Sequence, residues 1–431
     1  ITNLGQKNKI DHVTGLFNRF EFENEIRRRA SSSVAAEFSI LLLDIDDFKN
    51  INDLYNRVFG DEIIRITAQK IQTLLPRDTP VYRLDGDEFG IVVNGGDESR
   101  VRKIYSAICE NFGRQQEYDG KKYFCTLSAG CVFYPRDAAT YEDLFKFAEY
   151  CLDYSKNNGK NRITLYTEEI LAHKERSLEL TELMRESMEQ GYRGFELYYQ
   201  PQVNASSKQV VGAEALARWR CDKYGEVSPV EFIPILEESG LIVPAGKWIF
   251  YQAAKKCREW RRIQPDFVMS INLSYLQVAD PDFLPFLRRT LTSLEVDPAN
   301  LVVEFTESYL VKNGDSLHNI FDAIRSLGIK IAMDDFGTGY SSLEVLKKAP
   351  ADTVKIDRAF IKDIRTSSFD ATFIRFIVEL CHDVGIEVCL EGVESPEEYQ
   401  IVSPMNLDYI QGFLFGRPEP AESFERKFMQ I

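Results

Sequence analysis

Hydrophobic segments that resemble β-strands alternate with segments of helical length from residue 195 onward, and this alternation restricts the fold more than any other feature. The eight expected strands cover residues 195–203, 210–219, 267–274, 301–308, 328–335, 353–358, 387–394 and 409–415. Eight strands spaced in this way predict a closed (β/α)8, TIM-like α/β barrel. Only NASSKQ, residues 204–209, separates the first two strands, which is too short for the crossover that parallel strands require. We therefore expect strand one to run antiparallel to strand two.

The first part of the chain has a different pattern of expected secondary structure, in which amphipathic helices are interspersed with separate β-strands. Helical patterns cover 17–30, 48–75, 99–117 and 141–157, and β runs cover 38–48, 80–93, 125–134 and 163–166. This mixture predicts an α+β domain with a mixed or antiparallel sheet. Within 80–93, Asp85-Gly86 joins two alternating runs and predicts a two-residue type I′ hairpin. Residues 167–191 have apolar positions at helical spacing, so we divide the chain into 1–166, a helical connector 167–191, and 192–431.

Composition excludes several classes of protein. The 431 residues are too many for one ordinary core, and the formal net charge of −15 disfavours binding to polymeric nucleic acid. Eight cysteines without a C-x-x-C pair, and only four histidines, argue against zinc-ribbon and haem-attachment chemistry and suggest reduced thiols. No apolar run has the length of a membrane helix and no secretion signal is present. We expect a cytoplasmic fragment of a longer protein, because the chain begins at Ile and its input signal would be received upstream.

Polar side chains stand near the end of nearly every expected barrel strand. They are Glu214, Asn272, Glu304, Asp334, Asp335, Lys355, Asp357, Glu391 and Gln411. A barrel gathers these ends on one face, where its active sites lie. So many carboxylates would repel one another unless cations lay among them, and oxygen-only ligands favour Mg²⁺ or Mn²⁺ over zinc. Adjacent aspartates can bridge two such ions, an arrangement that suits cleavage of a phosphodiester.

The competing explanation is that each acid caps a helix or forms a surface ion pair. It is the better explanation for any one of these residues alone, but not for seven successive strands. The charge distribution agrees with a site for cations, because residues 1–166 carry 23 basic and 25 acidic side chains and the remainder carries 29 and 42.

Seven motifs in the second part together resemble the EAL-domain cyclic-di-GMP phosphodiesterases. They are EALARW (214–219), INLS (271–274), EFTES (304–308), DDFGTGYSSL (334–343), KID (355–357), EGVE (391–394) and QGFLFGRP (411–418). The resemblance implies two-metal hydrolysis of cyclic di-GMP to linear pGpG. It implies a first metal held by Glu214, Asn272, Glu304 and Asp334, and a second held by Asp334, Asp335 and Glu391.

The same resemblance implies roles for other residues. Lys355 would orient or deprotonate the attacking water, and Gln411 would contact that water or the phosphate. Gln200, Arg218 and Asp357 would contact the substrate, and Glu307 would steady the loop 334–343. A homodimer is also implied.

The first part resembles the GGDEF diguanylate cyclases, a family with a palm-like (ferredoxin-like) fold. The resemblance rests on DHVTGLFNR (11–19), DIDDFKNIND (44–53), RLDGDEF (83–89) and SKNNGKNR (155–162). It implies that Asp44 and Asp87 bind Mg²⁺ on GTP and that Glu88 assists at the 3′-hydroxyl. It also implies guanine contacts at Asn52 and Asp61, and phosphate contacts at Lys49, Lys156 and Lys160.

This front part departs from the family pattern. Asp85 stands where the family has its first glycine, and a carboxylate there would add bulk and like charge beside the phosphates of GTP. Asn56-Arg57 replaces the family's Gly-His, and the R-x-x-D inhibition motif is absent. We therefore expect little cyclase activity, with either retained GTP binding that regulates the barrel or a role as a spacer. Two alternatives for the whole chain stay open, a catalytically silent cyclic-di-GMP receptor and a bifunctional cyclase and phosphodiesterase.

Overall fold

The computed structural model describes residues 9–31, 37–76, 78–306, 319–337, 346–347 and 351–429. The chain divides into two compact units, Ile1–Leu178 and Glu179–Ile431. The division falls within helix α6 (Glu168–Glu189), inside the expected connector. No helix in the described part of the chain is both long enough and apolar enough to cross a bilayer.

The first unit is an α+β domain built on a six-stranded mixed sheet with the order β1-β3-β4-β2-β7-β8. The pairs β1–β3 and β7–β8 are parallel and the other neighbours are antiparallel. Its strands are β1 (Phe17–Asn18), β2 (Phe38–Ile45), β3 (Val81–Asp85), β4 (Glu88–Asn94), β7 (Leu127–Tyr134) and β8 (Ile163–Leu165), with a separate hairpin of β5 (Gln116–Tyr118) and β6 (Lys121–Tyr123). Its helices are α1 (Arg19–Ala30), α2 (Phe48–Tyr55), α3 (Arg57–Leu74), α4 (Glu98–Phe112) and α5 (Tyr141–Asn157).

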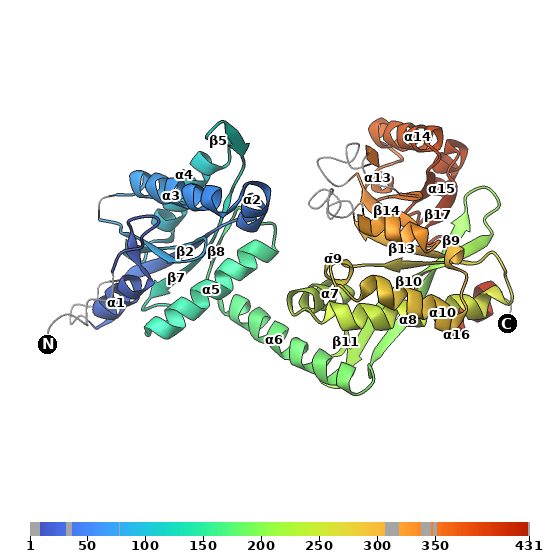
Figure 1. Ribbon diagram of the computed structural model, residues 1–431, viewed down its shortest axis with the longest axis horizontal. Coiled ribbons are helices and arrows are strands. Elements are labelled where there is room, and N and C mark those ends of the chain that lie inside the picture. The colour runs from blue at the N-terminus through green and yellow to red at the C-terminus, as the bar shows by residue number, and fades with distance from the viewer. Residues whose placement is uncertain are drawn as a thin grey trace. The chain divides into compact units, whose positions relative to one another are not determined.

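Both faces of this sheet are covered by helices, which explains why every residue of β2 is buried. Leu41 and Leu43 pack with residues of α3 and α4, whereas Ile40 and Leu42 point the other way and pack with residues of α1 and α5. Figure 1 shows these two pairs of helices on opposite faces of the sheet. The alternation of successive side chains along a strand therefore supplies two separate cores.

Three expectations for this unit were wrong in detail. The helix expected over 48–75 is interrupted at Asn56, which has a φ of 127° and caps α3 by accepting from the Phe59 amide. The helix expected to reach residue 117 ends at Phe112, because the chain then turns into the β5–β6 hairpin. The turn between β3 and β4 holds Gly86 and Asp87, and of these two described residues only Gly86 has a positive φ, 47°. One positive φ at the first turn position matches type II′ rather than the expected type I′.

The second unit is the closed eight-stranded α/β barrel that the alternation predicts. Its strand order is β10-β12-β13-β14-β15-β16-β17-β9, and pairing of β9 with β10 completes the ring. The strands are β9 (Phe195–Asn204), β10 (Val210–Cys221), β12 (Val268–Asn272), β13 (Leu301–Thr306), β14 (Lys330–Phe336), β15 (Thr353–Ile356), β16 (Glu387–Leu390) and β17 (Tyr409–Gln411), with short additions β11 (Gly225–Val227) and β18 (Glu419–Pro420).

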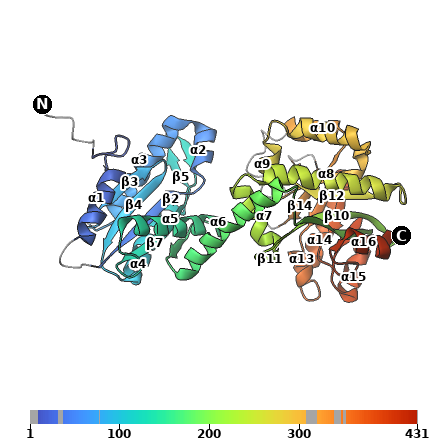
Figure 2. The same cartoon turned by 90° about the horizontal axis from the view of Figure 1, so that it is seen from below.

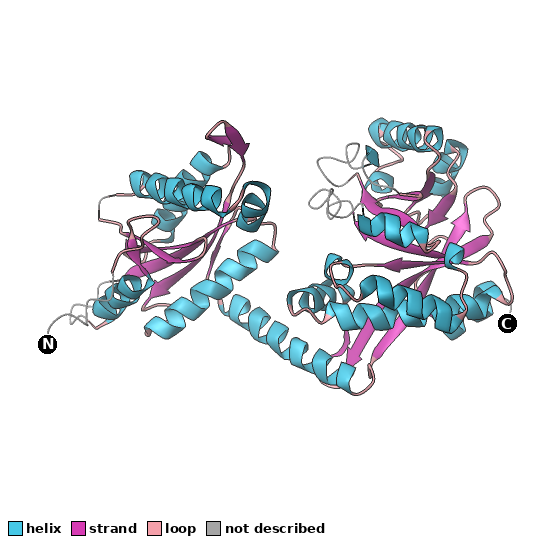
Figure 3. Ribbon diagram, viewed as in Figure 1, coloured by secondary structure: helices cyan, strands magenta, loops and turns pink. Residues whose placement is uncertain are grey.

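Helices lie outside the strands, as Figures 2 and 3 show. They are α7 (Pro229–Glu238), α8 (Ile242–Arg261), α9 (Tyr275–Val278), α10 (Phe283–Leu294), α13 (Ala359–Lys362), α14 (Ser368–Asp383), α15 (Pro396–Val402) and α16 (Ala421–Phe424). Short turns η1 (Pro298–Asn300) and η2 (Ser403–Met405), and a π-helical turn η3 (Glu425–Met429), complete the described elements.

The first barrel strand is antiparallel to both of its neighbours, β10 and β17, as the short loop 204–209 predicts. The loop is closed by Asn204, whose Oδ1 accepts hydrogen bonds from the backbone amides of Ser206 and Ser207. The remaining neighbours around the ring are parallel. Their carboxyl ends therefore meet on one face of the barrel.

Candidate active site

Lys355 lies at the centre of the site, where its side chain points from β15 into the barrel and is almost wholly buried. Its Nζ lies 2.7 Å from Glu304 Oε2, 2.7 Å from Glu391 Oε1, 3.2 Å from Glu214 Oε2 and 3.4 Å from Asp334 Oδ1. These carboxylates come from β13, the end of β16, β10 and β14. One ammonium thus holds together acids from four different strands.

Glu214 is the most highly connected of these carboxylates. Gln411 Nε2 donates to Glu214 Oε2 at 2.6 Å, and Asn272 Nδ2 donates to Glu214 Oε1 at 2.6 Å. Gln411 Nε2 also donates to Gln200 Oε1 at 3.1 Å, and Gln200 in turn reaches the backbone of Gly416. The sequence-predicted residues Gln200, Glu214, Asn272 and Gln411 therefore form one network.

The pKa values of the acids in this cluster differ because their surroundings differ. Burial alone would raise the pKa of Glu214, but the Lys355 ammonium and the hydrogen bonds from Gln411 and Asn272 outweigh it and lower that pKa. Burial raises the pKa of Glu304 well above its ordinary range and that of Glu391 to about 7. Burial would lower the pKa of Lys355, yet the surrounding carboxylates, Asp334 first, raise it well above its ordinary value. Lys355 is therefore a firmly charged group in this arrangement.

Asp334 and Asp335 both lie near the site because β14 is irregular there. Residues of a regular strand alternate between faces, but the pairing of β14 with β15 shifts between Met333 and Phe336, and Asp335 has a φ of 56°. Asp334 Oδ1 accepts from the Asp335 amide at 3.0 Å. Burial, followed by the charges of Asp334 and Asp357, raises the pKa of Asp335 to about 6.

The remaining predicted substrate contacts lie outside the Lys355 network. Arg218 lies farther along β10 than Glu214, with its guanidinium 5.1 Å from the Tyr198 ring centroid and one N–H bonded to the Ala217 carbonyl. Asp357 follows β15 and accepts from the Ala359 amide at 2.8 Å, which starts α13. Glu307 lies outside the described residues, as does most of the loop 334–343.

The donor set suits a hard divalent cation. Every side chain in the cluster that could ligate offers oxygen, the preference of Mg²⁺ and Mn²⁺. Among the described residues Oε1 of Glu304 has no hydrogen-bond partner although its side chain is fully buried. In the described ranges, no three acidic, histidine or cysteine side chains lie close enough together to form a ready-made set of metal ligands.

The predicted nucleotide residues of the first unit are brought together in part. Asp44 of β2 is paired across strands with Glu88 of β4, and its Oδ2 lies 2.7 Å from Lys156 Nζ. Burial raises the pKa of Asp44 to about 7 and also raises the pKa of Asp87 and of Glu88. One buried acid and two half-buried acids beside a lysine suit a cation and a phosphate.

Other predicted residues of this unit lie around that cluster. A Cβ added to Gly60 would come within 1.9 Å of Asn52 Oδ1, so a larger residue at 60, next to Asp61, would displace the Asn52 side chain. Lys160 pairs with Asp47 at 2.7 Å, and Lys49 is exposed. The carboxylate of Asp85 accepts from the Gly86 amide at 2.8 Å and so occupies one N–H of the turn.

One residue of the barrel network has no place in the sequence-based prediction. Gln202 Nε2 donates to Gln411 Oε1 at 3.0 Å and lies 3.4 Å from Ser270 Oγ. A signal existed, because Gln202 is two residues after Gln200 on a strand and must share its face. Its partner is 209 residues away along the chain, and that pairing depends on the closed barrel.

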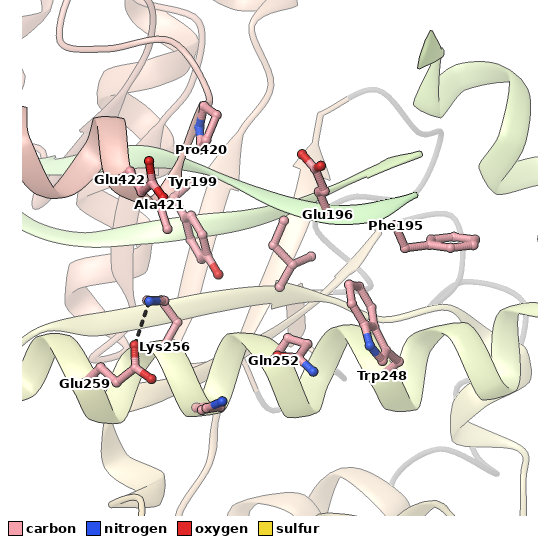
Figure 4. A pocket seen from close by; sticks show the side chains of 12 residues that line it. Phe195, Glu196, Tyr199, Trp248, Gln252, Lys256, Glu259, Pro420, Ala421 and Glu422 are labelled. Carbon is pink, nitrogen blue, oxygen red and sulfur yellow. Dashed lines mark hydrogen bonds and ion pairs between the residues drawn. The ribbon is translucent and has the colours of Figure 1, made fainter. Parts of the chain in front are cut away.

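Two hollows in the described part of the barrel bear on the assignment of the site. One, of about 400 Å³, lies on its outer surface between β9, α8 and residues 420–422, and Figure 4 shows Glu196, Gln252 and Lys256 among the side chains that line it. It contains none of the sequence-predicted site residues. The other, of about 280 Å³, lies inside the barrel and is lined by Gln202, Ser270, Glu304, Lys355 and other inward-facing residues.

Two family models match the chain in order. The model described as "Diguanylate cyclase, GGDEF domain" matches residues 8–162, and the model described as "EAL domain" matches residues 182–418. The chain is 30% identical over 415 residues to a Pseudomonas aeruginosa protein named bifunctional diguanylate cyclase/cyclic di-GMP phosphodiesterase MucR, covering 96% of this chain and 60% of that protein. It is also 30% identical over 416 residues to the Escherichia coli cyclic di-GMP phosphodiesterase PdeR, covering 96% of this chain and 62% of the relative. The chain thus spans about three fifths of the length of these relatives.

Solved structures show the same architecture. A structure named PaMucR phosphodiesterase in complex with c-di-GMP matches with a TM-score of 0.54 and 36% identity, and the match covers 57% of this chain and 99% of that one. The Vibrio cholerae LapD S helix-GGDEF-EAL structure matches with a TM-score of 0.64 over 94% of this chain and 96% of that one, at 18% identity, which shows the fold alone.

Proposed function

This chain belongs to the tandem GGDEF–EAL proteins, and on that premise we propose that its barrel hydrolyses one phosphodiester bond of cyclic di-GMP to give linear pGpG. The observation that carries the proposal is the convergence of Glu214, Glu304, Asp334 and Glu391 on Lys355 at the carboxyl ends of the barrel strands. The relatives named as cyclic di-GMP phosphodiesterases, and the solved structure in complex with that ligand, support the same substrate.

Two divalent cations, Mg²⁺ or Mn²⁺, fit this donor set. Glu214, Asn272, Glu304 and Asp334 would hold the first, and Asp334, Asp335 and Glu391 the second. Such ions supply an activated water and neutralise charge on the phosphate oxygens. The unpartnered Oε1 of Glu304, and the irregular β14 that brings both aspartates to the mouth, support this assignment.

The residues of the chain have separate tasks in this proposal. Lys355, whose ammonium lies among the four carboxylates, orients or deprotonates the attacking water. The same ammonium keeps the four carboxylates from repelling one another before cations bind. Gln411 presents its amide to Glu214 and contacts the water or the phosphate. Gln200, Arg218 and Asp357 border the substrate.

We propose that the first unit binds GTP with little or no cyclase activity. Asp44, Asp87, Glu88 and Lys156 support binding of a cation and a phosphate. Asp85 argues against turnover, because its carboxylate is fixed to the turn amide of Gly86 and would repel phosphate. Replacement Asp85→Gly removes that charge, and new cyclase activity would identify it as the block. No gain would shift the cause to Asn56 and Arg57.

We further propose that the protein is a cytoplasmic homodimer. All eight cysteines are free and seven are buried, which fits a reducing compartment.

Phe369 and Phe376 on α14 are 70% and 50% exposed and lie on the helix face that also carries Phe373. A second copy of the chain would cover this aromatic face. Light scattering of the wild type and of Phe369→Ser/Phe376→Ser tests this, and a monomeric wild type would overturn it.

The deciding experiment is incubation of the chain with cyclic di-GMP and Mg²⁺, with and without GTP, following pGpG by chromatography. Turnover that rises with GTP supports a phosphodiesterase regulated by its first unit. Turnover that is indifferent to GTP makes that unit a spacer. Binding without turnover establishes the receptor alternative and overturns the proposal.

A further inference from the structure

We propose that Gln202 is a positioning residue for the barrel site: its amide donates to Gln411 and thereby fixes the orientation in which Gln411 donates to Glu214. The inference rests on the proposed phosphodiesterase activity. Gln202 is not among the expected ligands or substrate contacts, and it touches Glu214 only through Gln411.

The antiparallel first strand creates this arrangement. In the register of β9, Gln200 lies opposite Glu214 of β10, and Gln202 lies opposite Gln411 of β17. Residues two apart on a strand point to the same face. One strand therefore sends two glutamine side chains into the barrel, one level with the carboxylates and one beneath them.

Hydrogen-bonding chemistry leaves Gln411 a single satisfactory orientation. An ionised carboxylate only accepts, so the amide nitrogen of Gln411 must face Glu214. Its two N–H groups are used by Glu214 Oε2 at 2.6 Å and Gln200 Oε1 at 3.1 Å. The carbonyl oxygen then faces β9, where only a donor satisfies it, and Gln202 Nε2 is that donor at 3.0 Å.

Gln202 is partly buried, and its side chain borders the internal cavity of about 280 Å³, together with Ser270, Ala332 and Cys389. Two hydrogen bonds orient its amide, one to Gln411 at 3.0 Å and one to Ser270 Oγ at 3.4 Å. The cavity also gives room for replacement side chains of similar length.

Three replacements separate hydrogen bonding from packing. Gln202→Met removes the donor and should reduce kcat about five- to tenfold, the effect of one net hydrogen bond. Gln202→Glu places an acceptor against the Gln411 carbonyl, turns that amide toward the wrong partners, and should reduce kcat about 100-fold. Gln202→Lys restores a hydrogen-bond donor, so its kcat should be higher than that of Gln202→Met and of Gln202→Glu. KM for cyclic di-GMP should change less than about threefold throughout, because Gln202 lies beneath the carboxylates rather than at the mouth of the barrel.

The matched control is Asn204→Asp, which adds the same charge at the border of the same cavity, two residues along β9. The carboxylate keeps the acceptor that closes the loop to Ser206 and Ser207, and Asn204 has no contact with Gln411. Its kcat should stay within twofold of wild type. Thermal unfolding of every variant checks that the barrel is intact.

The outcomes separate the inference from the proposed function. A wild-type chain without turnover overturns the phosphodiesterase proposal, and this inference with it. An active wild type in which Gln202→Glu matches Asn204→Asp, or in which Gln202→Met is as active as Gln202→Lys, overturns the positioning role alone. A kcat that falls in the order Gln202→Lys, Gln202→Met, Gln202→Glu, with KM unchanged, supports the positioning role.

Discussion

Replacement of Lys355 by methionine tests the electrostatic account of the barrel site most directly. The side chain keeps its length and apolar stem, so packing changes little, while the ammonium that contacts four carboxylates is lost. At the effective dielectric of a protein, each of these contacts corresponds to about 5–6 kcal/mol of attraction before the burial penalty is subtracted. Uptake of protons by Glu304 and Glu391, whose pKa values are already raised, offsets part of the loss.

Breaking a buried ion cluster by removing one partner costs about 3–5 kcal/mol. For a unit of this size we therefore expect Lys355→Met to lower the unfolding temperature of the second unit by about 6–20 °C in EDTA. Excess Mg²⁺ should restore much of that stability, because a cation replaces the lost ammonium. Turnover of cyclic di-GMP should stay at least about 100-fold below wild type even in Mg²⁺, because the group that orients the water is absent.

Calorimetry with EDTA or Mg²⁺ and a chromatographic assay of pGpG measure these effects. The control is Lys362→Met on α13, an exposed lysine of the same unit. If Lys355→Met unfolds at the same temperature as that control in EDTA, the carboxylates do not depend on the ammonium. The charge-balance reasoning would then be refuted.

Three further changes test other parts of the molecule. Glu214→Ala should abolish detectable turnover and weaken Mn²⁺ binding, measured by calorimetry, while the far-ultraviolet spectrum is unchanged; retained turnover would contradict the site assignment. Asp335→Gly should relieve a left-handed backbone position and raise stability by up to about 1 kcal/mol while reducing turnover, and urea unfolding that shows a loss of stability would contradict the strain. Asp44 has a folded pKa raised to about 7, so its contribution to stability is present below its ordinary pKa and is lost as the pH rises through about 7. In Asp44→Asn the stability of the first unit, from urea unfolding at pH 5 to 8 without GTP or Mg²⁺, should depend less on pH, and an unchanged slope would exclude Asp44 as its source.

The barrel could be predicted from local patterns because each pattern has a local cause. Side-chain alternation and helix-length spacing identified eight strands, and the length of the loop 204–209 was enough to reverse the first of them, since chain reach limits the connection. Local patterns did not predict where one element ends and the next begins within the first unit. The interruption at Asn56 and the β5–β6 hairpin depend on the packing of α3 and α4 against the sheet, which a helical pattern alone cannot reveal.

Residue types and motif order predict which chemical groups form the site and on which face of the barrel they gather. The motifs and the expected strand ends identify Glu214, Glu304, Asp334, Lys355, Glu391 and Gln411. How these groups pair depends on the closed barrel. Lys355 contacts four acids at once, β14 is irregular where it presents Asp335, and Gln202 donates to Gln411 from a strand 209 residues away. The reason is physical. Residue type and strand periodicity are local properties, whereas hydrogen-bond partners and pKa shifts depend on distances that exist only when the ring of strands has closed.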